Sequence, residues 1–118
     1  MATTYEVIIF TKFMENATVT QYSSSAVPNE KNRTIIDKFT VTNVTPFANL
    51  TFDVHIVNAG DAVTDTNKII DARPLAVGET YDCPELVGVV LAESQSIATF
   101  TAAENSLVLR ASGRFSTT

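Results

Sequence analysis

The hydrophobic residues of this chain follow the two-residue period of β-strands. The clearest example runs from Ala48 to Val57, where apolar side chains alternate with Thr51, Asp53 and His55; the apolar positions are Leu50, Phe52, Val54 and Ile56. This alternation predicts a strand with one face in a core and the other facing solvent or a partner. His55 lies on the polar side of the pattern, so we expect it to have a structural or surface role.

Further strands are predicted by runs rich in Thr, Val, Ile, Phe and Tyr, which are residues favoured in sheets. In the strand that begins at Arg33, Ile35, Phe39 and Val41 are expected to share one face with Asp37. Polar segments at residues 23–32 and 58–67 are expected to be loops. The predicted strands other than 48–57 span residues 5–13, 17–22, 33–42, 68–73, 79–83, 96–101 and 106–115.

The residues after Cys83 predict the one short helix, from Pro84 to about Ala92. Proline suits a first helical turn because that turn leaves backbone N–H groups unpaired, and Glu85 complements the helix dipole. Gly88 weakens this helix. Its apolar side chains are expected to close one end of the core, and they are Leu86, Val87, Val90 and Leu91.

About eight short strands with turn residues between them predict an all-β fold, an antiparallel β-sandwich or a jelly-roll-like barrel with one short helix. The 118 residues contain no repeat, so we expect a single domain over residues 1–118. Residues 1–32 would supply N-terminal strands or an arm, and residues 33–118 the core. A chain of this length buries roughly two thirds of its unfolded surface and folds without metals or disulfides.

The charge of the chain restricts its partners. The net charge is −5, and the eight Lys and Arg residues are scattered. Nucleic acids and anionic membrane surfaces both require clustered cationic side chains, so neither is expected as a partner. No apolar stretch approaches the ~20 residues that span a bilayer, and the N-terminus does not have the pattern of a secretory signal. The single Cys83 excludes an intramolecular disulfide and favours a reducing compartment, or one in which disulfides are not needed.

The residues with reactive side chains do not form a catalytic or metal-binding pattern. His55 is the only histidine, which is too few for the usual metal cluster. Cys83 precedes a predicted helix start, where a thiol pKa can fall, but it has no cationic partner or second cysteine and is predicted to be a small buried residue. Asp61, Asp65 and Asn67 share a loop whose spacing does not match a calcium-binding loop. We therefore expect no catalytic residue, no cofactor and no metal, and do not expect an enzyme.

The N-terminal strand has apolar residues on both faces, although a strand in this position usually has one exposed face. A subunit interface formed by Val7, Ile9, Phe10 and Phe13 would explain this pattern. The alternative is that the predicted helix or a loop of the same chain covers the strand.

The segment from about Arg33 to Gly113 resembles small β-sandwich virion proteins of phages and prophages. The matching residues are 39–43, 54–57, Leu75 with 78–81, 85–88 with Val90 and Leu91, Ser96 with Ile97, and 109–113. Proteins of this kind include capsid cement or decoration subunits, often trimeric, and tail accessory parts. The resemblance implies a homotrimer on the capsid surface, in contact with the major capsid protein and made in the host cytoplasm. No catalytic residue carries over, and residues 1–32 lie outside the resemblance.

Three alternatives remain. A tail or baseplate accessory protein would be confined to the tail. A glycan-binding β-sandwich would need exposed aromatic rings for stacking on sugars; Tyr5, Tyr22 and Tyr81 are the candidates, and Trp is absent. An enzyme would require Cys83 to be a reactive thiolate.

Overall fold

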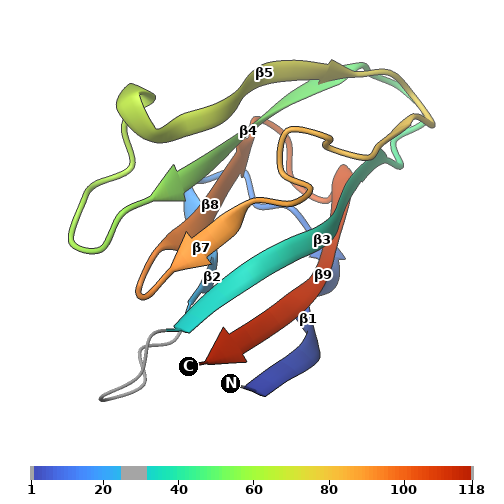
Figure 1. The fold of residues 1–118 in the computed structure, drawn as a ribbon. Coiled ribbons are helices and arrows are strands. Elements are labelled where there is room, and N and C mark those ends of the chain that lie inside the picture. Colours follow the sequence, from blue (N-terminus) through green and yellow to red (C-terminus); the bar gives the residue numbers. More distant parts are fainter. Residues whose placement is uncertain (1, 25–31, 118) are drawn as a thin grey trace.

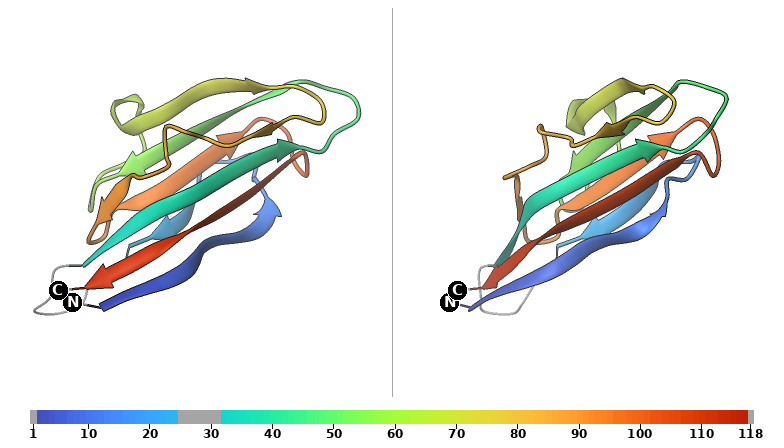
Figure 2. Two further views of the ribbon diagram at one scale, coloured as in Figure 1. Left: turned by 45° about the vertical axis from the view of Figure 1, so that its right-hand side comes forward. Right: turned by 90° about the vertical axis from the view of Figure 1, so that its right-hand side faces the viewer.

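Two antiparallel sheets lie face to face in the computed structural model, which describes residues 2–24 and 32–117 (Figure 1). The first sheet has the order β1 (Ala2–Phe13), β9 (Leu107–Thr117), β3 (Asn32–Asn43) and β6 (Thr80–Tyr81), and β7 (Val90–Ala92) also pairs with β3. The second has the order β2 (Val19–Ser23), β8 (Ser96–Thr101), β4 (Leu50–Val57) and β5 (Lys68–Leu75). Figure 2 shows the two layers from the side, with β1 at one edge. The predicted all-β sandwich is confirmed, with nine strands over the described residues.

The core lies between the sheets and is formed by alternate residues of the strands. Strand β9 is typical, because Leu107, Leu109 and Ala111 are buried while Arg110 is exposed. The second sheet contributes Phe52 and Val54 from β4 and Ile97 from β8, among others. The expected core face of β4 is therefore correct.

A β-bulge changes which residues of β3 face the core. Ile36 pairs with Gly113 and Lys38 with Ser112, so Asp37 is an extra residue with no opposite residue in the strand register of β9. An extra residue reverses the alternation beyond it. Ile36 is consequently buried together with Phe39, and Asp37 is exposed. The prediction that Asp37 shares a face with the buried Phe39 was wrong, because the period of two does not continue through a bulge.

The predicted helix at residues 84–92 is also wrong. Residues 84–88 form turns and Val90–Ala92 form β7. Gly88 has a φ of 85°, and its N–H donates to the Ile36 carbonyl at 2.7 Å. The segment thus bonds to the edge of β3 in place of forming helical hydrogen bonds, although Leu86 and Leu91 still fill the core as expected. Among the described residues, the only helical element is a 3-10 turn, η1 (Asp65–Asn67), and none is long or apolar enough to cross a bilayer.

The remaining boundaries agree closely with the predicted ones. Pro74 lies inside β5 because β5 is an edge strand, where a missing N–H can face away from the sheet. The two N-terminal strands pair with β9 and β8, which places them in the same two sheets as the later strands. Most of the predicted loop at 23–32 lies outside the described residues.

Candidate interaction surface

Strand β1 is the free edge of the first sheet. One side of it bonds to β9, and no other described strand pairs with it. The N–H and C=O groups on its second side are therefore available to a further strand. With 12 residues, β1 offers a long edge of this kind.

Bulky apolar side chains project from this strand into solvent. Tyr5 is 79% exposed, Phe10 76%, Phe13 45% and Val7 38%. We call these four residues the β1 surface. Exposed aromatic side chains gathered on one strand are typical of a protein-binding surface, since a monomeric protein usually keeps its exposed apolar patches small. Tyr5 was missing from the predicted interface, although its alternation with Val7 is visible in the sequence.

Ile9, which was included in the predicted interface, belongs to the core of its own chain and is only 3% exposed. The cause is a bulge in β1. Val7 pairs with Ser112 and Ile9 with Ala111, so Ile8 is an extra residue between them. The bulge lets Ile8 and Ile9 both point inward, which simple alternation does not allow. The interface hypothesis therefore retains Val7, Phe10 and Phe13.

Polar side chains close the core beside the first half of β1. The Tyr22 hydroxyl donates to Glu6 Oε1 at 2.8 Å and lies 2.9 Å from the Thr34 hydroxyl, which in turn lies 3.0 Å from Ser24 Oγ. Burial raises the pKa of Tyr22 to about 12, and the nearby Glu6 carboxylate adds to this rise. Tyr22 therefore stays protonated at neutral pH and links the two sheets by hydrogen bonds.

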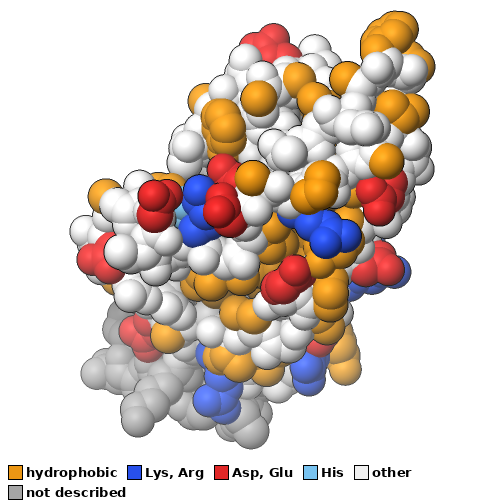
Figure 3. All heavy atoms as spheres, turned by 90° about the horizontal axis from the view of Figure 1, so that it is seen from above, with side chains coloured by type: hydrophobic (Ala, Val, Ile, Leu, Met, Phe, Trp, Pro, Cys, Tyr) orange, Lys and Arg blue, Asp and Glu red, His pale blue; other side chains and the backbone are white. Residues whose placement is uncertain are grey.

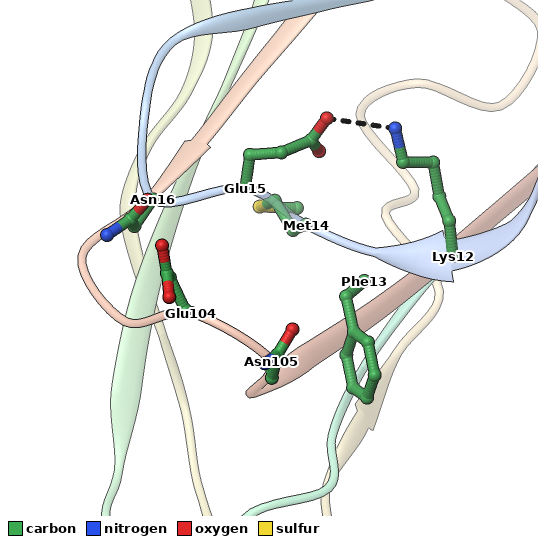
Figure 4. A pocket seen from close by; sticks show the side chains of 7 residues that line it. All are labelled: Lys12, Phe13, Met14, Glu15, Asn16, Glu104 and Asn105. Atoms are coloured by element: carbon green, nitrogen blue, oxygen red, sulfur yellow. Dashed lines mark hydrogen bonds and ion pairs between the residues drawn. The ribbon is translucent and has the colours of Figure 1, made fainter.

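A shallow pocket lies at the other end of β1 (Figure 4). In this view Lys12 and Glu15 form an ion pair at 2.9 Å on one side, and Phe13 and Asn105 lie on the other. Although burial acts to raise it, hydrogen bonds from Gln21 and Lys12 hold the pKa of Glu15 below its usual value. The carboxylate is thus already satisfied by its neighbours. The pocket continues the β1 surface through Phe13.

Only one of the three tyrosines considered for sugar stacking presents an open ring. The Arg73 guanidinium carbon lies 4.1 Å from the centre of the Tyr81 ring, and the Tyr81 hydroxyl donates to Glu85. Tyr22 is held in the hydrogen bonds described above. Tyr5 remains exposed and is part of the β1 surface.

His55 is buried, so of the structural and surface roles expected for it the structure shows the structural one. The β4–β5 loop covers it: Nδ1 lies 2.8 Å from Asn67 Oδ1 and 3.1 Å from the Thr64 carbonyl oxygen. Both neighbours are acceptors, so Nδ1 carries the proton and donates. His55 anchors this loop to the sheet.

Cys83 is fully buried, as predicted. Burial, with Glu85 and Asp82 nearby, raises its pKa to about 12. The helix start that could have lowered this pKa does not form. The thiol is therefore protonated at neutral pH and is a poor nucleophile.

Two of the loop residues considered as metal ligands, Asn67 and Asp65, bond to neighbouring residues of the chain. Asn67 accepts from the Thr64 N–H at 3.1 Å and donates to the Ala62 carbonyl at 2.8 Å. Asp65 is exposed and pairs with Lys68 at 3.4 Å. Within the described residues, no three His, Cys, Asp or Glu side chains are grouped as a metal site.

Figure 3 shows the molecule from above relative to Figure 1, and on this face positive and negative side chains are mixed. Lys, Arg, Asp and Glu are interspersed there with hydrophobic side chains, without a patch of one sign (Figure 3). This face therefore lacks the clustered positive charge that nucleic acids require.

Comparison with protein-family models, with curated protein sequences and with solved structures finds no match for this chain. A function must therefore be inferred from its own residues.

Proposed function

We propose that this chain is a structural subunit of a phage particle that binds other proteins through the β1 surface. In the most specific form of the proposal it is a capsid cement or decoration subunit. It would contact copies of itself and the major capsid protein on the outside of the head. This form is suggested by the strand and turn residues of 33–113 alone, because the comparisons with known proteins find no match.

The observation that carries the proposal is the group of aromatic side chains on a free edge strand. Tyr5 and Phe10 each have more than three quarters of their surface exposed. Leaving rings of this size in water forgoes roughly 1.5–3 kcal/mol of burial per side chain, which association with another protein would recover. Unpaired backbone groups along the same strand would add directional hydrogen bonds to that contact.

The net charge of −5 also suits a position on the outer surface of a shell, away from the packaged genome. A cement protein needs a rigid core and self-complementary contacts that symmetry can repeat. The sandwich supplies the core, and the β1 surface would supply the self-complementary contacts.

A tail or baseplate accessory protein would use the same surface and would differ only in its place on the particle. A glycan-binding role is less well supported, because Tyr5 is the only one of the three tyrosines with an open ring.

Immunogold electron microscopy of particles from the source lysate tests the proposal, using antibody against the recombinant chain. Dense label on heads is the expected result, and label confined to tails would assign the chain to the tail. If no particle is labelled while the antigen is present in the lysate, the proposed role is wrong.

A further inference from the structure

We infer that two copies of the chain pair antiparallel along their β1 strands, about a twofold axis at Ile9, so that Glu6 of each copy faces Lys12 of the other. The biological setting of this pair rests on the proposed function, but the contact itself can be tested on the purified chain. The inference adds a strand register to the proposed β1 surface, whose exposed residues are described above.

Two pairs of charged or aromatic residues on β1 lie at equal distances from Ile9, although Phe10 has no aromatic counterpart. Glu6 and Lys12 each lie three residues from it, and Tyr5 and Phe13 each lie four residues from it. In an antiparallel pair of identical strands, residues at equal distances from the twofold axis lie opposite each other. The register at Ile9 therefore brings opposite charges together and also places Tyr5 of one copy beside Phe13 of the other.

The opposed side chains also project from the same side of the sheet. Glu6 and Lys12 pair with Gly113 and Leu109 of β9, which are both core-facing. Tyr5 and Phe13 pair instead with Arg114 and Val108, which face outward. Two register shifts interrupt β1, between Val7 and Ile9 and between Ile9 and Lys12, and their effects on the alternation cancel. The side chains at one end of β1 therefore project from the same face of the sheet as the side chains opposite them at the other end of the second copy.

The charged groups have bonding capacity left for this contact. Lys12 Nζ has three donors and uses one on Glu15, while Glu6 accepts from Tyr22 through Oε1. The net charge of −5 makes two copies repel at long range. Two Glu6–Lys12 contacts would offset part of this repulsion at the contact itself and would favour this register over others.

The bulges restrict how β1 can pair. Between Val7 and Lys12 the strand is irregular, so pairing is confined to residues 5–7 of one copy with residues 11–13 of the other, formed twice. Bulges on an edge strand discourage indiscriminate pairing. A strand with the same irregularity at the same distance from the axis would be the best match, and a second copy provides it.

Charge reversal tests this register. Sedimentation velocity would compare the chain with Glu6→Lys, with Lys12→Glu and with an equimolar mixture of the two variants. Each variant alone opposes like charges twice, so we expect its dimer to be weakened by about tenfold or more. In the mixture every contact again joins opposite charges, so dimers should return. If both variants fold by circular dichroism and the mixture stays monomeric, the register is wrong.

Disulfide trapping reads the register directly and leaves Glu6 and Lys12 unchanged. A Tyr5→Cys chain mixed with a Phe13→Cys chain should form a crosslinked heterodimer on oxidation, because cross-strand partners lie close enough for a disulfide. A sample of either chain alone should crosslink poorly. In a dimer of that chain, the introduced cysteines of the two copies would lie eight residues apart along the strand, roughly 26 Å. Equal crosslinking in all three samples, or a trimeric mass for the unmodified chain, would overturn the twofold pair. Label on phage heads would still support the proposed function.

Discussion

The side chain of Ile8 fills the space that a side chain at position 113 would need. A Cβ atom on Gly113 would stand 2.5 Å from Ile8 Cδ1 and would also overlap the Ile35 carbonyl oxygen. Gly113 lies on β9 beside the bulges of both neighbouring strands. A glycine at this point lets the backbone of β3 and the side chain of Ile8 approach closely.

Gly113→Ala should therefore destabilise the protein. The methyl group would collide with backbone as well as with Ile8, and we expect a loss of about 2 kcal/mol or more in the free energy of unfolding. Urea unfolding followed by circular dichroism measures this loss. Ser112→Ala is the matched control, because the neighbouring residue points outward and should change stability by less than about 0.5 kcal/mol. Equal stability of the two variants would contradict the packing described.

Ala72→Gly should have the opposite effect. Ala72 has a φ of 46°, a conformation that favours glycine, and its N–H donates to Asp53 Oδ1 at 2.6 Å. Relief of the backbone strain should stabilise the protein by up to about 1 kcal/mol, because Ala72 is exposed and loses no packing. Ala76→Gly, at an exposed residue without a positive φ, should instead be neutral or destabilising in the same urea unfolding experiment. A loss of stability in Ala72→Gly would contradict the expected gain.

Asn67→Ala should release the loop that covers His55. The Asn67 amide bonds to Thr64 and Ala62 and accepts from His55. Its removal leaves the buried His55 donor with only the Thr64 carbonyl, at an expected cost of about 1–3 kcal/mol. Asp65→Ala is the control from the same turn, because its side chain is 98% exposed and should contribute little. Thermal unfolding of both variants would show whether the loop is anchored in this way, and similar midpoints would argue against it.

Cys83 should react very slowly in the folded protein. Because burial raises its pKa from 9 to about 12, the thiolate fraction at pH 8 is roughly a thousandfold smaller than for an unperturbed thiol. The labelling rate with a thiol reagent should rise about tenfold per pH unit below that pKa, provided that the fold is intact. Unfolding in urea should remove the protection. Fast labelling of the folded chain at neutral pH would contradict this account and would revive a catalytic thiol.

The strands could be predicted from the sequence because a period of two is a local property. β8 was predicted at Ser96–Thr101, where it lies, and β4 within two residues. The helix at Pro84 could not be excluded, because local preferences permit it and only hydrogen bonds to the distant β3 decide the conformation. Bulges at Ile8 and Asp37 were also invisible, since they depend on how many residues the partner strand offers at that point.

The candidate site was predicted in part for the same reason. An apolar N-terminal strand identified Val7, Phe10 and Phe13, which are exposed in the structure. Ile9 was assigned to the same surface because alternation cannot show a bulge. For His55 the sequence left a structural and a surface role open, because the pattern of β4 gives no sign of the loop that covers it.

The most direct test of the central claim, that the β1 surface is an association surface, is sedimentation velocity of the chain beside its Phe10→Ser/Phe13→Ser variant. In the single chain Phe10 is largely exposed and Phe13 is about half exposed, and neither belongs to the buried core, so we expect the variant to unfold as cooperatively as the parent. The account predicts that the parent self-associates at micromolar to millimolar concentration and that the variant is monomeric. A monomeric parent over this range, or a variant with the same mass distribution as an associating parent, would contradict it.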